Sequence, residues 1–537
     1  MSLLLQFAAY FAACSLALVQ ADKSVFEPAD FDVAAALGNY GVNTSAIASL
    51  EISKEQSTES ACLAACGTLT SVFGSHRVLA ENTPAYNNFT GSFWSAQQEE
   101  VKPRCVFKPA KNTDVSVIVL LSRLTGCPFA ARSGGHAAFA GASSSPGGIT
   151  IWFKDLNEVT LNGDKSVASV EPGNVWGQVY KALEPYGLAT LGGRASDIGV
   201  GGLTTGGGIS YYSNEYGWVL DNVESFEVVT ASGQIVTASE TKYSDLYWAL
   251  RGGGNNLGLV TKFNLYTIPS PMMRGGARIF TQDHFSDVLG AFVKVVHDAP
   301  RDPYAQYYIA FVSAKGANIA SAELTYSKDV ADPAIFKPFR SIPAVSDTTS
   351  SKTLIEQCDE INSLNPIGLR EVYWTVAVQL NEEFANWAVD YFFSVLPQVS
   401  HVKGINPALI YQAVTEPMLK NMTKYGGNAL GLDPAKGPVH LMHISCWWAD
   451  TFDDKTIYKF VNDFWDTVIA KAKDMGIYNR WIYMNYASEF QDVIASYGDE
   501  NKDRLQSVAG KYDPKAVYQT LQPGYFKLNR VPAVFPY

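Results

Sequence analysis

The residues with the clearest capacity for chemistry stand together in one short stretch, Arg132-Ser133-Gly134-Gly135-His136. The two adjacent glycines leave backbone N–H groups uncovered by side chains, and a concave turn of this kind favours an anionic group. The histidine that follows would hold a nucleophilic imidazole beside that group. The alternative is a surface loop with an incidental histidine, so the rest of the chain has to decide between the two interpretations.

A dense cluster of glycines follows further along the chain. Eight glycines fall within 17 residues, a density that predicts neither a regular helix nor a well-packed strand. Ile198, Val200 and Leu203 are apolar, whereas flexible linkers are polar and rich in serine. We therefore expect a binding wall made of backbone. The glycines are Gly192, Gly193, Gly199, Gly201, Gly202, Gly206, Gly207 and Gly208, and a further glycine turn stands at 252–254.

The common nucleotide, metal and hydrolase signatures do not match. The segment Gly199-Val200-Gly201-Gly202 lacks the GxGxxG spacing, and we do not expect it to open a helix. Gly510-Lys511 is followed by Tyr512, which excludes a Walker lysine site. There is no HExxH, no GxSxG, no CxxC pair and no histidine pair separated by three to five residues. We expect no metal site.

The whole chain has the composition of a globular protein with more than one core. It has 537 residues, of which 47% are hydrophobic and 17% charged, so two domains or one large two-lobed unit is expected. The net charge of −11 and the lack of a dense Lys/Arg run argue against nucleic acid as a partner. The many aromatic residues suit a small uncharged or aromatic ligand.

The pattern of local elements divides at about residue 270. Before it, strands such as 167–170, 225–230, 234–238 and 257–265 alternate with helices such as 245–250, and Asn174 can cap a helix that follows it. A turn at 231–233 joins the strands 225–230 and 234–238 into a hairpin. The segment 115–124 is either a helix or a buried strand. From about 277 to 480, strands alternate with amphipathic helices, which predicts an α+β domain with an antiparallel sheet. The tail contains a helix over 500–512.

The N-terminus indicates export. Residues 1–21 are mostly apolar and end at Val19-Gln20-Ala21, as in a secretory signal peptide, although no Lys or Arg precedes the apolar run. After its removal we expect no membrane segment. Six cysteines remain, and Cys62 and Cys66 could each bridge one of Cys105 and Cys127. Sequons at Asn43, Asn88 and Asn421 permit N-glycans.

Three motifs together resemble the berberine bridge enzyme-like oxidoreductases of the vanillyl-alcohol oxidase superfamily. They are the 132–136 stretch, the run from Gly199 to Gly208, and the segment from Asp245 to Gly254. Tyr483-Met484-Asn485-Tyr486 and Lys511-Tyr512-Asp513-Pro514 resemble the family's closing segment. The match covers about 100–270 and 483–526. It implies an α+β, two-lobed fold: an FAD-binding domain over 22–270 with a PCMH-type core at about 100–270, a substrate-binding domain over 271–482, and a C-terminal segment over 483–537 that completes the FAD domain.

The resemblance also implies how FAD is held. Its pyrophosphate would lie over 133–136, its adenine near Gly258–Val260, and His136 would be joined to the 8α carbon of the flavin. A covalent imidazole withdraws electrons from the flavin and favours hydride abstraction. The implied cofactor-binding residues are Arg132, Ser133, Gly134, Gly135, His136, Gly141, Gly199, Gly201, Gly202, Thr205, Gly207, Gly208, Gly252, Val260, Asn485 and Tyr486.

Departures from the family pattern limit what can be carried over. Ala195 stands where many members have a second, cysteinyl link, so one covalent bond is expected. Ala138 and Ile209 replace tyrosines found in members that act on alcohols. We expect Tyr483 to remove a proton or orient substrate, with Asn485 beside it, yet a phenol acts as a base only if its pKa is lowered. A core aromatic that packs the cofactor is the alternative, and the histidines His401, His440 and His443 could serve instead.

These observations predict a secreted FAD-linked oxidase. It would take hydride from a small, largely apolar alcohol or an activated ring carbon, in secondary metabolism, and dioxygen would reoxidise the flavin to give hydrogen peroxide. The alternatives are a secreted oligosaccharide oxidase, a flavoprotein cyclase or isomerase in which FAD is redox-neutral, and a non-catalytic binding protein.

Overall fold

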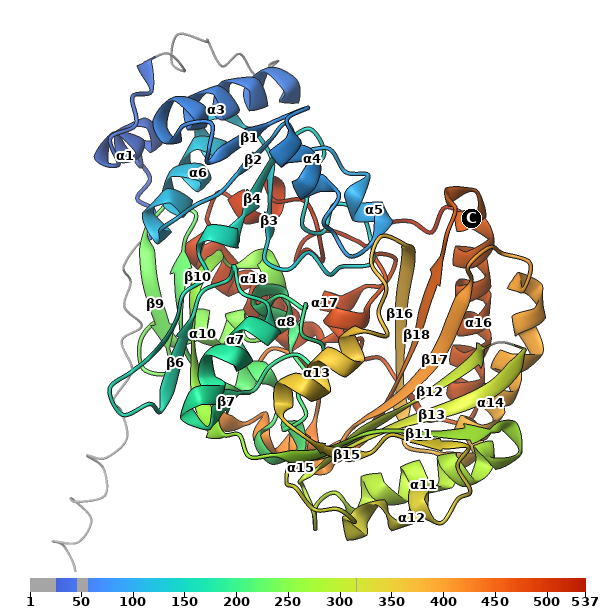
Figure 1. The fold of residues 1–537 in the computed structure, drawn as a ribbon. Coiled ribbons are helices and arrows are strands. Elements are labelled where there is room, and N and C mark those ends of the chain that lie inside the picture. The colour runs from blue at the N-terminus through green and yellow to red at the C-terminus, as the bar shows by residue number, and fades with distance from the viewer. Residues whose placement is uncertain (1–25, 46–56, 315) are drawn as a thin grey trace, which may run out of the picture.

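A computed structural model describes residues 26–45, 57–314 and 316–537 (Figure 1). The expected signal peptide, 1–21, lies outside the described residues. A four-stranded and a six-stranded sheet with their helices form one part of the molecule, called here the first lobe. A nine-stranded sheet with its helices forms the second lobe. The expected α+β, two-lobed architecture is confirmed.

The four-stranded sheet places the glycine turn at the end of a buried strand. Its order is β1 (Val78–Ala80), β2 (Cys105–Phe107), β4 (Ile149–Trp152) and β3 (Phe129–Arg132), with β3 and β4 parallel. The segment 115–124, for which the sequence allowed either a helix or a buried strand, lies in helix α6 (Asn112–Thr125). The helix ends at Gly126, whose backbone is in the left-handed conformation. Because β3 ends at Arg132, the turn begins where the sheet stops.

Two disulfides join helix α3 (Thr58–Phe73) to this region. Cys62 is bonded to Cys127 and Cys66 to Cys105, which is one of the two pairings that the sequence allowed. Cys358 and Cys446 are buried free thiols. The bridges tie an N-terminal helix to the strands that lead into the histidine turn.

The six-stranded sheet carries the second half of the first lobe. Its order is β5 (Val159–Leu161), β6 (Val167–Val170), β10 (Leu259–Pro269), β8 (Val223–Val229) and β9 (Ile235–Ser239), and β7 (Leu188–Thr190) also pairs with β10. The expected β8–β9 hairpin and the helix α10 (Ser244–Leu250) are confirmed. The expected cap on α7 (Trp176–Leu183) is wrong, because the Asn174 amide donates to the Glu171 carbonyl instead.

The glycine cluster contains a helix that the sequence analysis did not expect. Helix α8 (Val200–Gly206) includes Gly201, Gly202 and Gly206, and Gly199 precedes it. Low helix propensity is overridden here by tertiary contacts. A Cβ on Gly206 would lie 2.1 Å from Asn485 Oδ1, so only glycine leaves room for that amide.

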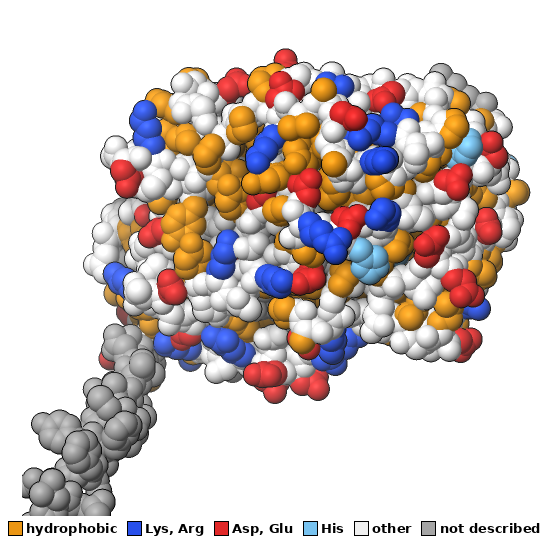
Figure 2. Space-filling view, turned by 90° about the horizontal axis from the view of Figure 1, so that it is seen from below, with side chains coloured by type: hydrophobic (Ala, Val, Ile, Leu, Met, Phe, Trp, Pro, Cys, Tyr) orange, Lys and Arg blue, Asp and Glu red, His pale blue; other side chains and the backbone are white. Residues whose placement is uncertain are grey.

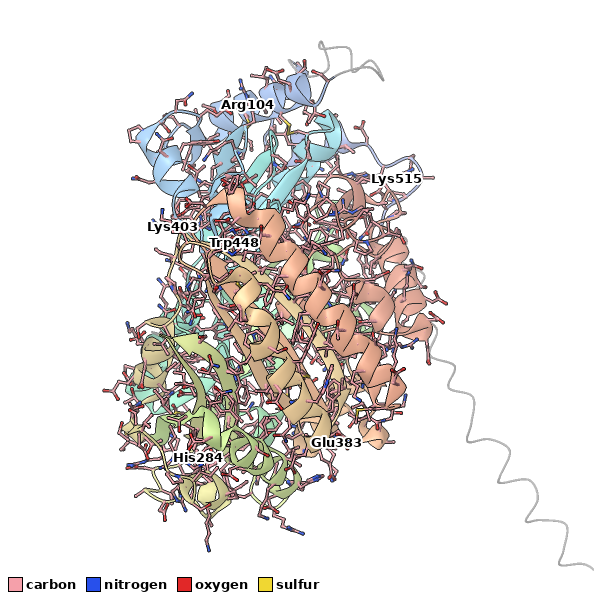
Figure 3. All side chains as sticks on the ribbon, turned by 90° about the vertical axis from the view of Figure 1, so that its right-hand side faces the viewer. Arg104, His284, Glu383, Lys403, Trp448 and Lys515 are labelled. Carbon is pink, nitrogen blue, oxygen red and sulfur yellow. A yellow bond between two sulfur atoms is a disulfide. The ribbon has the colours of Figure 1, made fainter. Side chains whose placement is uncertain are left out.

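The second lobe is one antiparallel sheet with helices on one face. The helices α11 (Phe285–Asp298), α14 (Glu382–Val395) and α16 (Asp454–Asp474) cover that face, and α14 and α16 lie side by side in Figure 3. The strand order is β14 (Ser346–Asp347), β11 (Met273–Thr281), β13 (Ala317–Tyr326), β12 (Ala305–Ala314), β17 (Asn406–Val414), β18 (Val439–Trp448), β16 (Arg370–Gln379) and β19 (Tyr478–Asn479), with β15 (Ser350–Lys352) paired to β11.

The C-terminal segment returns to the first lobe, and its last residues lie beside α16 of the second lobe (Figure 1). Helix α18 (Asp499–Tyr512), expected over 500–512, packs on α10. Beyond the short helix α19 (Val517–Thr520), the Asn256 amide donates to the Phe526 carbonyl at 2.8 Å. Figure 2 shows Lys and Arg interspersed with Asp and Glu over the lower face rather than gathered in one patch. Among the described residues no helix is long and apolar enough to cross a membrane.

A buried carboxyl group in β16 predicts a pH dependence of stability. Glu371 is fully buried, neither of its carboxylate oxygens has a hydrogen-bond partner in the described chain, and burial raises its pKa to about 10. The raised pKa in the folded state means that this group makes the protein less stable as pH rises from about 4.5 towards 10.

We expect Glu371→Gln to remove this pH-dependent loss of unfolding free energy, which amounts to about 1 kcal/mol for each pH unit. Thermal unfolding between pH 6 and 8 measures it, with Glu383→Gln on the exposed surface of α14 as the control (Figure 3). Equal pH slopes for Glu371→Gln and the parent protein would contradict the prediction.

Candidate active site

A cavity of about 330 Å³ is lined by residues of both lobes and of the C-terminal segment. One wall consists of the turn 133–138, the start of α8 and the start of β10. The opposite wall comes from the uncovered face of the nine-stranded sheet. The residues of that wall are Tyr308, Tyr373, Ile410, Gln412 and His443, with Ile361 and Asn365 beside them.

The turn after β3 directs its backbone N–H groups away from protein acceptors. Its carbonyls are engaged on one side: Trp94 N–H donates to the Gly135 carbonyl at 3.3 Å, and Ser95 Oγ donates to the Ala137 carbonyl at 2.8 Å. The Gln98 amide contacts both carbonyls. Within the described chain, the five N–H groups of 134–138 donate to no protein acceptor. Such a row of free donors on a cavity wall suits a phosphate group.

His136 is held by an aromatic ring and a carboxylate. Its imidazole stacks on Trp94 with 4.2 Å between ring centroids. Its Nε2 lies 3.5 Å from Asp197 Oδ1 and has no hydrogen-bond partner among the described residues. A proton on Nε2 would face Asp197 and leave the lone pair of Nδ1 for another partner.

The glycines of the cluster serve two purposes. A Cβ on Gly199 would lie 2.1 Å from the backbone nitrogen of Gly134, so these two loops touch through their main chains. Gly192 and Gly208 make room in the same way, for Trp176 and Val219. In contrast, Gly202 lines the cavity, and a Cβ there would meet nothing within 4 Å. Loop packing therefore explains most of the cluster, and Gly202 faces ligand space.

Tyr483 and Asn485 form a buried hydrogen-bonded unit. The Tyr483 hydroxyl accepts from Gly208 N–H at 2.9 Å and from the Asn485 amide at 3.1 Å. The same amide donates to the Leu203 carbonyl. Burial raises the pKa of Tyr483 well above its usual range, which is the opposite of what a base needs at neutral pH.

A second polar group projects from the other side of the cavity. Arg194 Nη2 donates to Gln412 Oε1 at 2.6 Å and to the Tyr486 hydroxyl at 2.9 Å. His443 stacks on Tyr486 with 4.4 Å between centroids. Burial, with Arg194 nearby, lowers the pKa of His443 to about 3, so its imidazole is neutral. His440 faces the helices instead, against Phe292.

Comparison with known proteins shows which families this chain resembles. Residues 103–239 match the family model described as "FAD binding domain". A FAD-dependent monooxygenase, tpcD, of Cochliobolus heterostrophus is 34% identical over 491 residues, which cover 88% of this chain and 95% of the relative.

The chain belongs to the berberine bridge enzyme-like, FAD-linked oxidoreductases.

Solved structures agree with this family in fold. The BBE-like 1 protein of Physcomitrella patens superposes with a TM-score of 0.68 at 17% identity, over 87% of this chain and 99% of that one. The glucooligosaccharide oxidase of Acremonium strictum gives a TM-score of 0.68 at 19% identity, over 89% and 100%. This berberine bridge enzyme-like protein is an oxidoreductase with an FAD-binding domain.

Most of the cofactor-binding residues expected in this berberine bridge enzyme-like chain lie together. Those that line the cavity are Ser133, Gly134, Gly135, His136, Gly199, Gly201, Gly202, Thr205, Val260, Asn485 and Tyr486, and Tyr483 lines it too. Those outside the lining are Arg132, Gly141, Gly207, Gly208 and Gly252. Free N–H donors, an available imidazole nitrogen and a methyl-sized space over Gly202 fit an FAD whose diphosphate lies on the turn.

Arg132 has a structural role in this fold. Its guanidinium donates to the Phe89 carbonyl and to Ser92 Oγ, and it lies 3.9 Å from the centroid of the Phe93 ring. It therefore anchors the segment before Trp94 on which His136 stacks. Gly252 donates its N–H to the Thr205 carbonyl and so fixes the end of α8.

Several residues of the site were missed from the sequence. Trp94, Arg194, Tyr308, Tyr373 and Gln412 line or support the cavity but stand in no recognised motif. Gln412 is the exception that could have been noticed, because it is a polar residue within the otherwise apolar strand β17. A buried glutamine needs a partner, and here it is an arginine 218 residues away.

Proposed function

We propose that this protein is a secreted FAD-linked oxidase of small, largely apolar molecules. It takes hydride from a carbon that bears a hydroxyl or from an activated ring carbon, in secondary metabolism, and dioxygen accepts the electrons as hydrogen peroxide. The observation that supports it most is the cavity itself. A row of free N–H groups and His136 lie on one wall, and aromatic and apolar side chains lie on the other.

The chain's own residues would hold FAD as follows. The N–H groups of 134–138 bind the diphosphate, the start of β10 around Gly258 to Val260 receives the adenine, and His136 forms one covalent bond through Nδ1. The orientation of Nε2 towards Asp197 supports that choice of nitrogen. The glucooligosaccharide oxidase is described as carrying an N1-histidyl link and a cysteinyl link, and Ala195 leaves only the histidyl one here. The bound flavin supplies the hydride acceptor.

Asp197 is expected to position His136 for this bond. Asp197→Asn removes the charge that holds the proton on Nε2, so we expect covalent attachment to slow about tenfold, equivalent to about 1.4 kcal/mol. Flavin fluorescence of the denatured protein on a gel, followed over time after reconstitution, measures it. Asp287→Asn is the matched control, because Asp287 faces His284 on the surface at 3.2 Å. Unchanged attachment in Asp197→Asn would contradict this role.

Tyr483 and Asn485 are proposed to orient substrate and flavin rather than to exchange protons. The Tyr483 hydroxyl already accepts two hydrogen bonds, and its pKa is raised. It fixes the Asn485 amide, which lines the cavity between α8 and Tyr486. Tyr486, whose hydroxyl accepts from Arg194, contacts the proposed substrate wall through its stack with His443.

The test of this function begins with colour. Purified protein should be yellow, and the colour should stay with the acid-precipitated pellet. With a panel of aromatic and aliphatic alcohols, one hydrogen peroxide should form for each dioxygen consumed. A colourless preparation that takes up no FAD would overturn the proposal, and so would turnover without oxygen consumption, which indicates a cyclase or isomerase.

A second candidate function is monooxygenation, because the relative from Cochliobolus is named a FAD-dependent monooxygenase. Isotopically labelled dioxygen separates the two. An oxidase leaves the label in peroxide, and a monooxygenase leaves one labelled atom in the product. Xylobiose and cello-oligosaccharides in the same panel test the oligosaccharide alternative.

Secretion and glycosylation belong to the same proposal. The two disulfides suit an oxidising compartment. Asn43 and Asn88 are exposed, whereas the Asn421 amide is partly buried and donates to the Pro417 carbonyl. We therefore restrict the proposed N-glycans to Asn43 and Asn88. The proposed division into domains remains 22–270, 271–482 and 483–537.

A further inference from the structure

Arg194 presents an incompletely paired cation to the cavity. Its Nη2 is shared between Gln412 and Tyr486, while its Nη1 is buried and has no acceptor in the described chain. Its guanidinium lies 4.9 Å from the centroid of the Tyr308 ring. None of the described carboxylates forms an ion pair with it. All its partners are therefore neutral.

A buried guanidinium with only neutral partners favours an anion as its remaining partner. Removing a charge from water is strongly unfavourable unless another charge compensates it. An acidic group on the neighbouring strands is Glu323 of β13, which is buried and accepts from the Gln357 amide at 2.6 Å. Glu323 does not line the cavity. The compensating charge must therefore come from what enters the cavity.

The surroundings of Arg194 define the rest of that ligand. Tyr308, Tyr373 and Tyr486 contribute aromatic rings, and Ile410 contributes an apolar side chain from β17. His443 is stacked on Tyr486, is neutral and so does not compete as a second cation. A planar aromatic body beside a single cation matches this wall better than a polyol, which needs many hydrogen-bond partners.

We propose that Arg194 binds an anionic oxygen of an aromatic substrate, either a carboxylate or an ionised phenol. Arg194 is thus a specificity-determining residue that selects acidic aromatic molecules. This inference rests on the proposed oxidase function in that the bound molecule is called a substrate. The binding itself does not depend on turnover. Bidentate pairing through a planar guanidinium is the geometry that carboxylates favour.

Calorimetric titration of the purified holoprotein tests the site with defined probes. Benzoate is compared with benzamide, its neutral counterpart, and pentafluorophenol, which is ionised at neutral pH, with its methyl ether. We expect benzoate or pentafluorophenol, whichever anion the site favours, to bind at least tenfold more tightly than its neutral counterpart. Arg194→Gln should abolish the difference, and Arg194→Lys should retain part of it. Arg301→Gln, an exposed arginine on the surface, should leave it unchanged.

Several results would overturn the proposal. Equal affinity for the anion and its neutral counterpart in both pairs would do so, as would a preference that survives in Arg194→Gln with unaltered melting temperature and flavin content. An arginine that neutralises only the bound cofactor would shift the flavin spectrum in Arg194→Gln without any anion preference in the parent protein. Should Arg194→Gln fail to fold, the parent protein and Arg194→Lys still decide the question.

The two proposals fail in different ways. If the protein binds benzoate through Arg194 but consumes no oxygen with any alcohol, the oxidase function is wrong and the anion site stands. If it oxidises neutral alcohols and binds neither anion preferentially, the oxidase function stands and the anion site is wrong.

Discussion

His136→Ala is expected to release the flavin from the protein. Acid precipitation should leave a colourless pellet and a yellow supernatant, because the only proposed covalent bond is to this imidazole. The remaining, non-covalently bound flavin should have a lower reduction potential. A fall of about 60 mV in a two-electron couple corresponds to about 100-fold in the equilibrium for substrate oxidation. Anaerobic titration with substrate, followed at the visible absorbance band, measures the corresponding shift of the equilibrium.

The control for this variant is a histidine outside the cavity. His297 is exposed on α11, and His297→Ala should keep the flavin in the pellet. The stack of His136 on Trp94 means that removal of the ring also leaves a space, so thermal unfolding is measured alongside. Covalent flavin retained in His136→Ala would refute the assignment of the link.

Gly199→Ala is expected to disrupt the cavity itself. The new methyl group would lie 2.1 Å from the backbone nitrogen of Gly134, and two main chains cannot relax as a flexible side chain would. Overpacking of this kind typically destabilises by about 1–3 kcal/mol. Because the displaced loop carries the free N–H groups of 134–138, flavin content should fall together with the melting temperature.

Two further glycines provide matched controls. Gly202→Ala places a methyl group where the protein has nothing within 4 Å, inside α8, where alanine favours the helix by about 1 kcal/mol over glycine. It should fold at least as stably as the parent and still bind flavin more weakly, since the methyl group enters ligand space. Gly163→Ala, in the exposed turn between β5 and β6, should change neither property. Normal flavin content in Gly199→Ala would show that the loop contact is dispensable.

The sequence predicts what depends on local chemistry. The turn before His136, the β8–β9 hairpin and the helix α10 all follow from residue types at short spacing, and the structure confirms them. The turn stands out in the sequence because two adjacent glycines directly precede a histidine there. The alternation of strands with amphipathic helices over 277–480 likewise predicts an α+β domain with an antiparallel sheet, which the structure confirms.

What the sequence does not predict depends on contacts between distant segments. Helix α8 forms in spite of its three glycines because Asn485 and Ser133 pack against it. Asn174 does not cap α7, because Val175 occupies the N-cap position, and the Asn174 amide donates to the Glu171 carbonyl. The pairing of Arg194 with Gln412 and Tyr486 joins three distant parts of the chain, and no short-range pattern in the sequence predicts it. The proposed role of Tyr483 changes from a base to an orienting group for the same reason, because burial among distant segments raises its pKa.

The cavity is lined by residues that the ribosome adds at widely separated stages of synthesis. His136 and Gly202 emerge first, whereas Asn485 and Tyr486, which line the same cavity, follow much later in synthesis. A nascent chain that stops before residue 483 has its glycine turn but neither the amide that packs on α8 nor the phenol that pairs with Arg194. Stable binding of the proposed flavin therefore requires synthesis to pass residue 486, and a premature stop codon ahead of residue 483 is expected to give a colourless product.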